Sequence, residues 1–133
     1  MANLPFEVFD PNAFTVLYDY PSSQAALSQV EVLNDTEAVA KRFEIYHQSF
    51  ELANGYQELR DFKTHEERFQ RAKQKRDEQD KSLVQTDTFF MRDLQRNELP
   101  ACCGVAVGFD RLMMLRHQVS NIKDILPFSW SEA

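Results

Sequence analysis

The stretch from Gly104 to Leu115 constrains the fold of this chain more than any other segment. Within it the small residues at positions 104, 106 and 108 alternate with Val105, Val107 and Phe109. An alternation with a period of two predicts a β-strand, here one with a face almost free of side chains. Such a face allows a flat ligand to lie directly against the strand backbone.

The residues that follow this strand predict a helix. Asp110 and Arg111 come directly before an apolar run that extends from Leu112 to Leu115. Arg111 is then expected in the first helical turn, where a guanidinium can meet a phosphate through two parallel hydrogen bonds. A buried strand-to-helix junction, in which Arg111 only pairs with a carboxylate, accounts for the same residues. This stretch alone therefore leaves both interpretations open.

The length and composition of the chain limit the classes of protein to consider. With 133 residues, of which 43% are apolar, the chain is expected to form one globular domain and not a disordered segment. Its net charge of −6 argues against a general nucleic-acid-binding surface, which would be basic. No apolar run approaches the ~20 residues that span a bilayer, and no signal peptide is visible. We therefore expect a cytoplasmic protein with no membrane partner.

The adjacent Cys102 and Cys103 are expected to be reduced. Neighbouring cysteines rarely form an unstrained disulfide, and no C-x-x-C or further cysteine accompanies them to build a metal site. Because they enter the strand described above, we predict that both are small side chains of the core.

The other strands are predicted from runs of β-forming residues bounded by turn signals. They lie at residues 14–20, at 30–33 and, as an antiparallel pair joined by a tight turn near 47–49, within 38–59. A short helical turn is expected at 22–27, with Ser22 or Ser23 as its cap. Asn54 and Gly55 mark either a bulge or a place where the backbone approaches a ligand.

A charged helix is predicted to begin at a capping box. Thr64 precedes Glu67 by three residues, the spacing at which each side chain can satisfy a backbone N–H of the other residue. Acidic and basic residues are interleaved from there to about Asp80, so most of this helix is expected to face solvent.

A second, shorter helix is predicted from Thr86 or Asp87 to Asn97. Its buried side chains are expected to be Phe89, Phe90 and Leu94. The apolar tail at 122–130 is expected to pack on the sheet.

Three glutamates spaced by seven residues, Glu44, Glu51 and Glu58, lie in the predicted strand pair. Acidic side chains among apolar neighbours are costly to bury without a partner. Across a single turn Glu44 and Glu51 could come close together, and a hard cation such as Mg²⁺ would relieve their repulsion. Glu58 would then be free to receive a cationic group of a substrate. For each glutamate alone, a carboxylate that simply faces water is the plainer alternative.

Several segments resemble the lysine-specific class II aminoacyl-tRNA synthetases. RFEIYHQSFELANGYQEL is similar to the family segment in which a metal-binding glutamate pair precedes E-[LI]-[AG]-N-G-[FY]-x-E-L, and residues 104–115 resemble the third signature motif of class II. YDYPSSQAAL and PACCGVAVG match two further family segments. Together these matches extend from about residue 14 to residue 130.

The resemblance implies an α+β fold in which helices flank an antiparallel sheet, as in the C-terminal part of a class II catalytic domain. The first and second signature motifs, which build a dimer interface and supply an arginine for the α-phosphate of ATP, have no match in residues 1–13. We therefore expect residues 1–133 to form a single partial domain that does not make an adenylate alone. Apolar surface left exposed would favour self-association or pairing with the missing N-terminal half.

For the nucleotide, the resemblance implies contacts of ATP with Glu51, Leu52, Gly108 and Arg111. Arg111 would meet the phosphates as the catalytic residue. Glu44 and Glu51 would hold Mg²⁺.

For the amino acid, the resemblance implies a pocket lined by Asn54, Tyr56 and Ala106, in which Glu58 pairs with the side-chain ammonium of lysine. The implied reaction is attack of the amino-acid carboxylate on the α-phosphate of ATP, which gives an aminoacyl-adenylate and releases pyrophosphate, followed by acyl transfer to an amine.

Within this family the chain is most similar to the short paralogues that lack an anticodon-binding domain and join β-lysine to a lysine of elongation factor P. Ala53, the Pro100-x-Cys102 sequence and Ala106 favour this branch. The methyl group of Ala106, where tRNA enzymes carry glycine, would favour a β-amino acid by only ~1–3 kcal/mol. A fragment of a true lysyl-tRNA synthetase, with tRNA as acceptor, and a non-catalytic module with the same fold are the alternatives.

Overall fold

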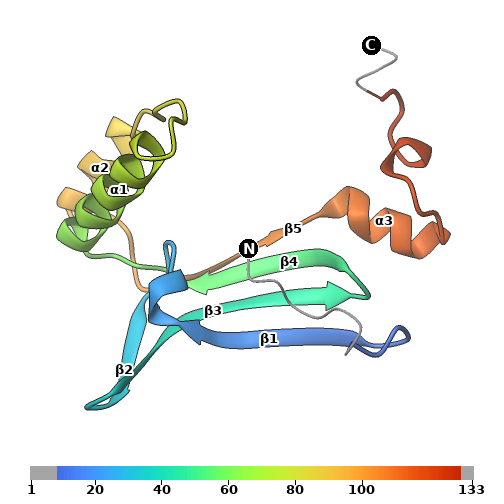
Figure 1. Ribbon diagram of the computed structural model, residues 1–133, viewed down its shortest axis with the longest axis horizontal. Coiled ribbons are helices and arrows are strands. Elements are labelled where there is room, and N and C mark those ends of the chain that lie inside the picture. The colour runs from blue at the N-terminus through green and yellow to red at the C-terminus, as the bar shows by residue number, and fades with distance from the viewer. Residues whose placement is uncertain (1–8, 130–133) are drawn as a thin grey trace.

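The long strand β3 (Glu37–His47) organises a five-stranded antiparallel sheet (Figure 1). The computed structural model describes residues 9–129. Strand β1 (Phe14–Pro21) pairs with β3 on one side, while β2 (Val30–Asn34) and then β4 (Phe50–Gln57) pair with it on the other. Strand β5 (Cys103–Val107) pairs with β4 and forms an edge of the sheet. The predicted α+β fold is confirmed, as are the strands and the β3–β4 turn.

The helices lie at the two ends of the sheet (Figure 1). The pair α1 (Phe62–Asp77) and α2 (Thr88–Gln95) is at one end, and α3 (Phe109–His117), which starts directly after β5, is at the other. The strand predicted up to Phe109 is therefore shorter, because Phe109 already belongs to α3. Arg111 lies in the first turn of α3, as predicted.

Two predicted helix caps are wrong. Helix α1 begins three residues earlier than expected, because the Asp61 side chain accepts hydrogen bonds from the backbone N and from Oγ1 of Thr64, both at 2.7 Å. Thr64 is thus a residue of the first turn and not the cap. The turn at Ser22–Gln24 has no side-chain cap; it follows Pro21, whose extended backbone leads into the turn.

A buried histidine that the sequence did not indicate joins the two helices to the segment that links β4 to α1. His65 is 1% exposed, its Nε2 lies 2.8 Å from the carbonyl oxygen of Leu59, and its ring contacts Phe69 and Phe90. Leu94 is buried and Phe90 half-buried, as predicted.

Phe89, by contrast, was predicted to be buried and is 69% exposed. Asp87 caps α2. Phe90 and Leu94, four residues apart, then share the inner face of the helix and turn Phe89 outward.

Two further predictions are wrong. The tail does not lie on the sheet: the turn at Ile122–Asp124 contacts α3, and Phe128 is 74% exposed. The chain reverses at Gln118, whose left-handed backbone ends α3, and Trp130 lies outside the described residues. Cys103 is exposed and Cys102 half-buried, so they are not a core pair, and both are free thiols.

In the described part of the chain, no helix has the length and apolar character needed to cross a membrane.

Candidate functional site

One side of the sheet, which we call the polar face, carries nearly all the residues predicted to bind ligands. Strand pairing sets Asn54 opposite both Glu44 and Ala106, and Tyr56 opposite both Arg42 and Gly104. Because directly paired residues point to the same side of a sheet, these side chains lie together. The residues of the polar face used below are Tyr20, Arg42, Glu44, Tyr46, Glu51, Asn54, Tyr56, Glu58, Gly104 and Ala106.

The other side, which we call the apolar face, is partly exposed, although Phe43 and Ile45 are half-buried and Gly55 is buried. Its residues alternate with those of the polar face along β1, β3, β4 and β5. They include Phe14, Val16, Tyr18, Phe43, Ile45, Gly55, Val105 and Val107. Tyr18 is 72% exposed and Val105 58%.

A bulge in β4 brings Glu51 onto the polar face. Ile45 pairs with Ala53 but Tyr46 pairs with Glu51, so Leu52 has no opposite residue. Glu51 and Asn54 consequently point the same way, and Asn54 Nδ2 donates to Glu51 Oε1 at 2.8 Å. The bulge therefore lies two residues before the predicted Asn54–Gly55 position.

Gly55 instead marks a close approach between strands. A Cβ atom there would lie 2.5 Å from the Phe43 ring and 2.8 Å from the carbonyl oxygen of Gly104. The approach is to protein atoms, whereas a ligand was one of the expected possibilities.

The four residues predicted to contact ATP converge where β4 begins and β5 ends. The backbone N–H of Gly108 donates to the carbonyl oxygen of Leu52 at 2.8 Å. Arg111 Nη1 donates to the carbonyl oxygen of Glu51 at 2.7 Å. Residues 51–52 and 108–111, which lie far apart in the sequence, thus form one connected group.

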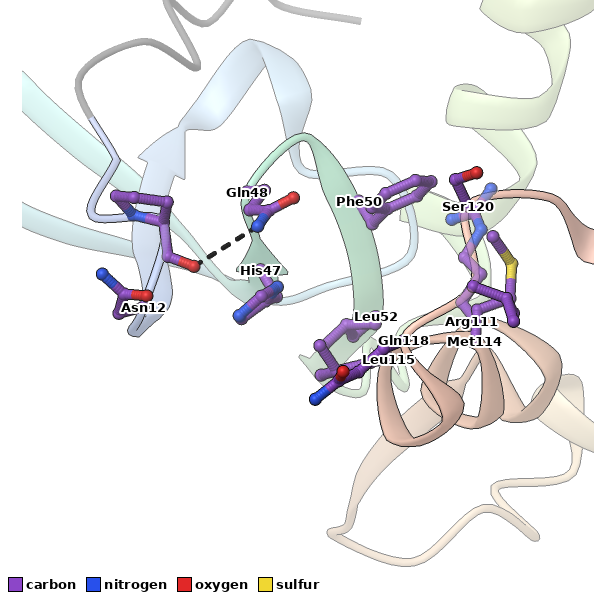
Figure 2. A pocket seen from close by; sticks show the side chains of 12 residues that line it. Asn12, His47, Gln48, Phe50, Leu52, Arg111, Met114, Leu115, Gln118 and Ser120 are labelled. Atoms are coloured by element: carbon purple, nitrogen blue, oxygen red, sulfur yellow. Dashed lines mark hydrogen bonds between the residues drawn. The ribbon is translucent and has the colours of Figure 1, made fainter.

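Arg111 also borders a cleft of about 510 Å³ between the β3–β4 turn and α3. Figure 2 shows Arg111 on α3 and Phe50 and Leu52 on β4 around this cleft. The cleft includes Leu52 and Arg111 from the predicted ATP contacts, but none of the residues predicted to bind the amino acid. Arg111 is exposed, so an anion in the cleft can reach its guanidinium.

Glu58 lies at the far end of the polar face. A Cβ atom on Gly104 would be 2.3 Å from Glu58 Oε1, so the carboxylate occupies the space that the glycine leaves open. Glu58 is half-buried and forms no ion pair with any residue between 9 and 129. A partly desolvated carboxylate without a cation is suited to bind an ammonium group.

Glu44 is held by three side chains at the centre of the polar face. Tyr20 donates to Glu44 Oε2 at 2.7 Å, Tyr46 donates to the same oxygen, and Arg42 Nη2 donates to Oε1. Burial, the largest single effect, raises the pKa of the Glu44 carboxyl, but these three donors outweigh it and hold the pKa below its usual range. Burial and the bond to Glu44 raise the pKa of Tyr46 to about 12 and that of Tyr20 as well.

Tyr20, Arg42 and Tyr46 were not among the predicted site residues. Arg42 and Tyr46 lie two residues before and after Glu44, so the period of a strand could have placed them beside it. Tyr20 could not have been found this way, because its position depends on the pairing of β1 with β3.

The predicted metal ligands Glu44 and Glu51 share the polar face, but they are not directly opposite each other. Residues 9–129 contain no group of three or more histidine, cysteine, aspartate or glutamate residues that could hold a metal ion. Glu44 is already occupied by protein donors. Glu51 keeps Oε2 without a hydrogen bond to the described residues, so it fits a cation better than Glu44 does.

Comparisons with known proteins find a matching family model and similar sequences. The family model described as "tRNA synthetases class II (D, K and N)" matches residues 7–132. A protein of Haemophilus ducreyi named elongation factor P–(R)-β-lysine ligase is 40% identical over 119 residues, which are 90% of this chain and 36% of that protein. Proteins of the same name from Proteus mirabilis and Salmonella arizonae are 40% and 35% identical, over 86% and 90% of the chain and 34% and 36% of their own length. The chain therefore spans about a third of the length of these relatives.

Proposed function

The chain belongs to the class II tRNA synthetases (D, K and N), and on that premise we propose that it forms the floor of an ATP-dependent ligase site. The substrate is lysine or β-lysine, activated as an adenylate and transferred to a lysine of elongation factor P. Two features at the opposite ends of β4 carry this proposal. At one end Glu58 is a carboxylate with no ion-pair partner among the described residues, and at the other end Arg111 of α3 donates to the carbonyl oxygen of Glu51. The printed names of the relatives support the choice of acceptor.

The amino acid is proposed to lie along β4 and β5. Its side-chain ammonium pairs with Glu58, and its aliphatic stem lies over Gly104 and against Tyr56. Ala106, which is exposed and opposite Asn54, lies under the amino and carboxylate end. These contacts require a cation at one end and a polar group at the other, which supports lysine-like substrates over apolar ones.

The nucleotide is proposed to lie across Glu51, Leu52, Gly108 and Arg111. In that complex the guanidinium of Arg111 donates hydrogen bonds to the phosphates in place of, or besides, its present bond to the carbonyl oxygen of Glu51. Mg²⁺ carried by ATP would be held by Glu51, with Glu44 joining only if the ion displaces one of its present donors. When bound, the ion neutralises phosphate charge.

The chemistry proposed for these residues is positioning and charge neutralisation, with no covalent enzyme intermediate. Glu58 and Asn54 hold the amino acid so that its carboxylate reaches the α-phosphate, and Arg111 balances the charge on the phosphates. Arg42, the arginine that β3 places on the polar face, is bound to Glu44 and to the carbonyl oxygen of Gln24, so it is not available for the α-phosphate. We therefore propose that the chain binds its ligands but does not form the adenylate alone.

Calorimetry with lysine, β-lysine and norleucine tests the binding proposal, because norleucine differs from lysine only in lacking the side-chain ammonium. Lysine and β-lysine are expected to bind and norleucine is not. Glu58→Gln is expected to weaken lysine binding by about 10- to 100-fold, since a charge-assisted hydrogen bond contributes ~1.5–3 kcal/mol. Equal binding of norleucine would refute the role of Glu58.

The two remaining points need separate measurements. ATP–pyrophosphate exchange with this chain is expected to be absent, and robust exchange would contradict the inactivity of the chain alone. Ala106→Gly is expected to shift binding from β-lysine towards lysine by roughly tenfold, since one methyl in a pocket contributes ~1–3 kcal/mol. An unchanged ratio would remove the argument for the β-isomer. An acceptor in translation also implies a cytoplasmic location.

Self-association is proposed from the apolar face and the free edge of β5. Val105 and Val107 are 58% and 54% exposed and belong to β5, an edge strand that carries no charged residue. Uncharged edges with exposed apolar side chains favour pairing with another chain. Sedimentation velocity across a range of concentrations measures this directly.

A further inference from the structure

Arg42 lies at the centre of the polar face, and none of the roles proposed above includes it as a ligand contact. Its side chain is only 14% exposed. Nη1 donates to the carbonyl oxygen of Gln24 at 2.9 Å, and Nη2 donates to Glu44. One guanidinium therefore connects the turn after β1 with the carboxylate of β3.

The same guanidinium lies between two aromatic rings. Its central carbon is 4.4 Å from the ring centroid of Tyr20 and 5.6 Å from that of Tyr56. Both distances lie within the ~6 Å range of cation–π attraction. Tyr56 is one of the residues predicted to line the amino-acid pocket, so Arg42 contacts a ring that lines this pocket.

The stability of the fold alone does not explain why a charged arginine is buried at position 42. Arg42 Nε is buried and donates to no atom among residues 9–129. Buried polar atoms are nearly always hydrogen-bonded, and exceptions concentrate at functional sites. Apolar residues of similar volume can replace buried ion pairs without loss of stability.

Arg42 also determines the distribution of charge on the polar face. It compensates Glu44, the carboxylate closest to Tyr56 on β3. Glu58 has no such partner among the described residues. The pocket therefore presents one unpaired carboxylate at the end where the substrate ammonium is proposed to lie.

We propose that Arg42 is a positioning residue of the amino-acid site, which holds the Tyr56 ring against the substrate stem and compensates Glu44, so that Glu58 is the unpaired carboxylate at the end of the pocket that receives the ammonium. The proposal rests on the proposed function and names the residue that shapes its pocket. Arg42 acts through Tyr56, Glu44 and Tyr20 and does not itself touch the substrate.

The test compares Arg42→Met with Lys41→Met in the full chain. Lys41 is the adjacent residue of β3 and is also ion-paired, with Asp19 at 3.1 Å and Glu31 at 2.9 Å, so it is a matched control for the loss of a cation from this strand. Arg42→Met is expected to weaken lysine binding by about tenfold, the effect of ~1.4 kcal/mol. Lys41→Met is expected to leave it unchanged. Arg42→Lys keeps the positive charge but loses the planar guanidinium. Its affinity for lysine is expected to lie between those of Arg42→Met and the unchanged chain.

A second measurement separates positioning from folding. In ¹³C NMR spectra of the tyrosine rings, Arg42→Met is expected to shift the Tyr56 signals, because the guanidinium 5.6 Å from the centre of that ring is gone. Arg42→Lys is expected to shift them less, and it replaces Arg42→Met should the latter fail to fold.

Each outcome decides the proposal. Undiminished lysine binding in Arg42→Met, while the unchanged chain binds lysine, overturns the positioning role alone. An equal loss in Lys41→Met overturns it as well, by assigning the effect to the charge of the strand. No lysine binding by the unchanged chain overturns the proposed function and the role of Arg42 with it.

Discussion

The two faces of the sheet are built from the same strands, yet they differ in how their side chains are satisfied. On the polar face Arg42, Glu44 and Tyr20 bind one another, so each is fixed by its neighbours. On the apolar face Tyr18 and Val107 are 72% and 54% exposed. Mutual contacts preorganise side chains for a ligand, whereas exposed apolar groups provide contact area for another protein surface. The difference supports a binding site on one face and an interface on the other.

The largest expected effect comes from Gly55→Ala, which adds a methyl group to the apolar face. The new Cβ would lie 2.8 Å from the backbone oxygen of Gly104 and 2.5 Å from the Phe43 ring, so β4 and β5 would have to separate. We expect the free energy of unfolding to fall by about 1–3 kcal/mol, as overpacking of a well-packed site does. Urea unfolding measures this change.

Gly104→Ala is the matched change on the polar face. Its Cβ would meet only the end of the flexible Glu58 side chain, 2.3 Å from Oε1. Glu58 can turn away, so we expect less than ~1 kcal/mol of lost stability. Lysine binding should nevertheless weaken, because the carboxylate is displaced. If both alanine variants cost the same stability and leave binding unchanged, the two faces do not differ as described.

Glu44→Gln tests whether the polar face is held together by charge. The donors around Glu44 lower its pKa in the folded chain, so its stabilising contribution is present above its unfolded pKa of roughly 4.3 and is lost as the pH falls through the lower folded value. We expect the variant to be less stable at pH 7 by about 1–3 kcal/mol, the effect of a disturbed buried hydrogen-bond group. The difference should shrink on acidification below about pH 4.

The matched variant for this pH dependence is Glu31→Gln, which removes an exposed carboxylate paired with Lys41. Exposed ion pairs contribute little, so its stability should follow that of the unchanged chain to within ~0.5 kcal/mol at each pH. A pH-independent difference for Glu44→Gln would show that the carboxylate acts by shape and not by charge.

Local signals in the sequence were sufficient for most of the fold. The alternation at 104–108 predicted β5, and the strand pair within 38–59 predicted that Glu44 and Glu51 come close, which agrees with their shared position on the polar face. A regular alternation would set Glu51 and Asn54 on opposite faces, so their contact was not predicted. Predictions that needed register or packing were incomplete. The bulge at Leu52 and the contact of Tyr20 with Glu44 depend on which strands pair.

Helix starts show the same limit. Thr64 and Asp61 both have sequences typical of a cap, and the aspartate provides it in the structure. Phe89 and Phe90 are equally apolar, so only the start of α2 determines which of them faces inward. The predicted burial of Cys103 was wrong for a related reason: Cys103 is exposed at the start of β5, which is an edge strand of the sheet.

The smallest expected effect on stability comes from Val107→Thr on the apolar face, and it sharpens the comparison most. Val107 is 54% exposed, so the free energy of unfolding should change by no more than ~0.5 kcal/mol. If this face is an interface, the added hydroxyl must be desolvated on association, and self-association should weaken in sedimentation velocity. Leu83→Thr is the control, since Leu83 is 63% exposed but lies between α1 and α2, away from the sheet. Equal weakening by both variants would mean that exposed apolar area in general, and not this face of the sheet, drives association.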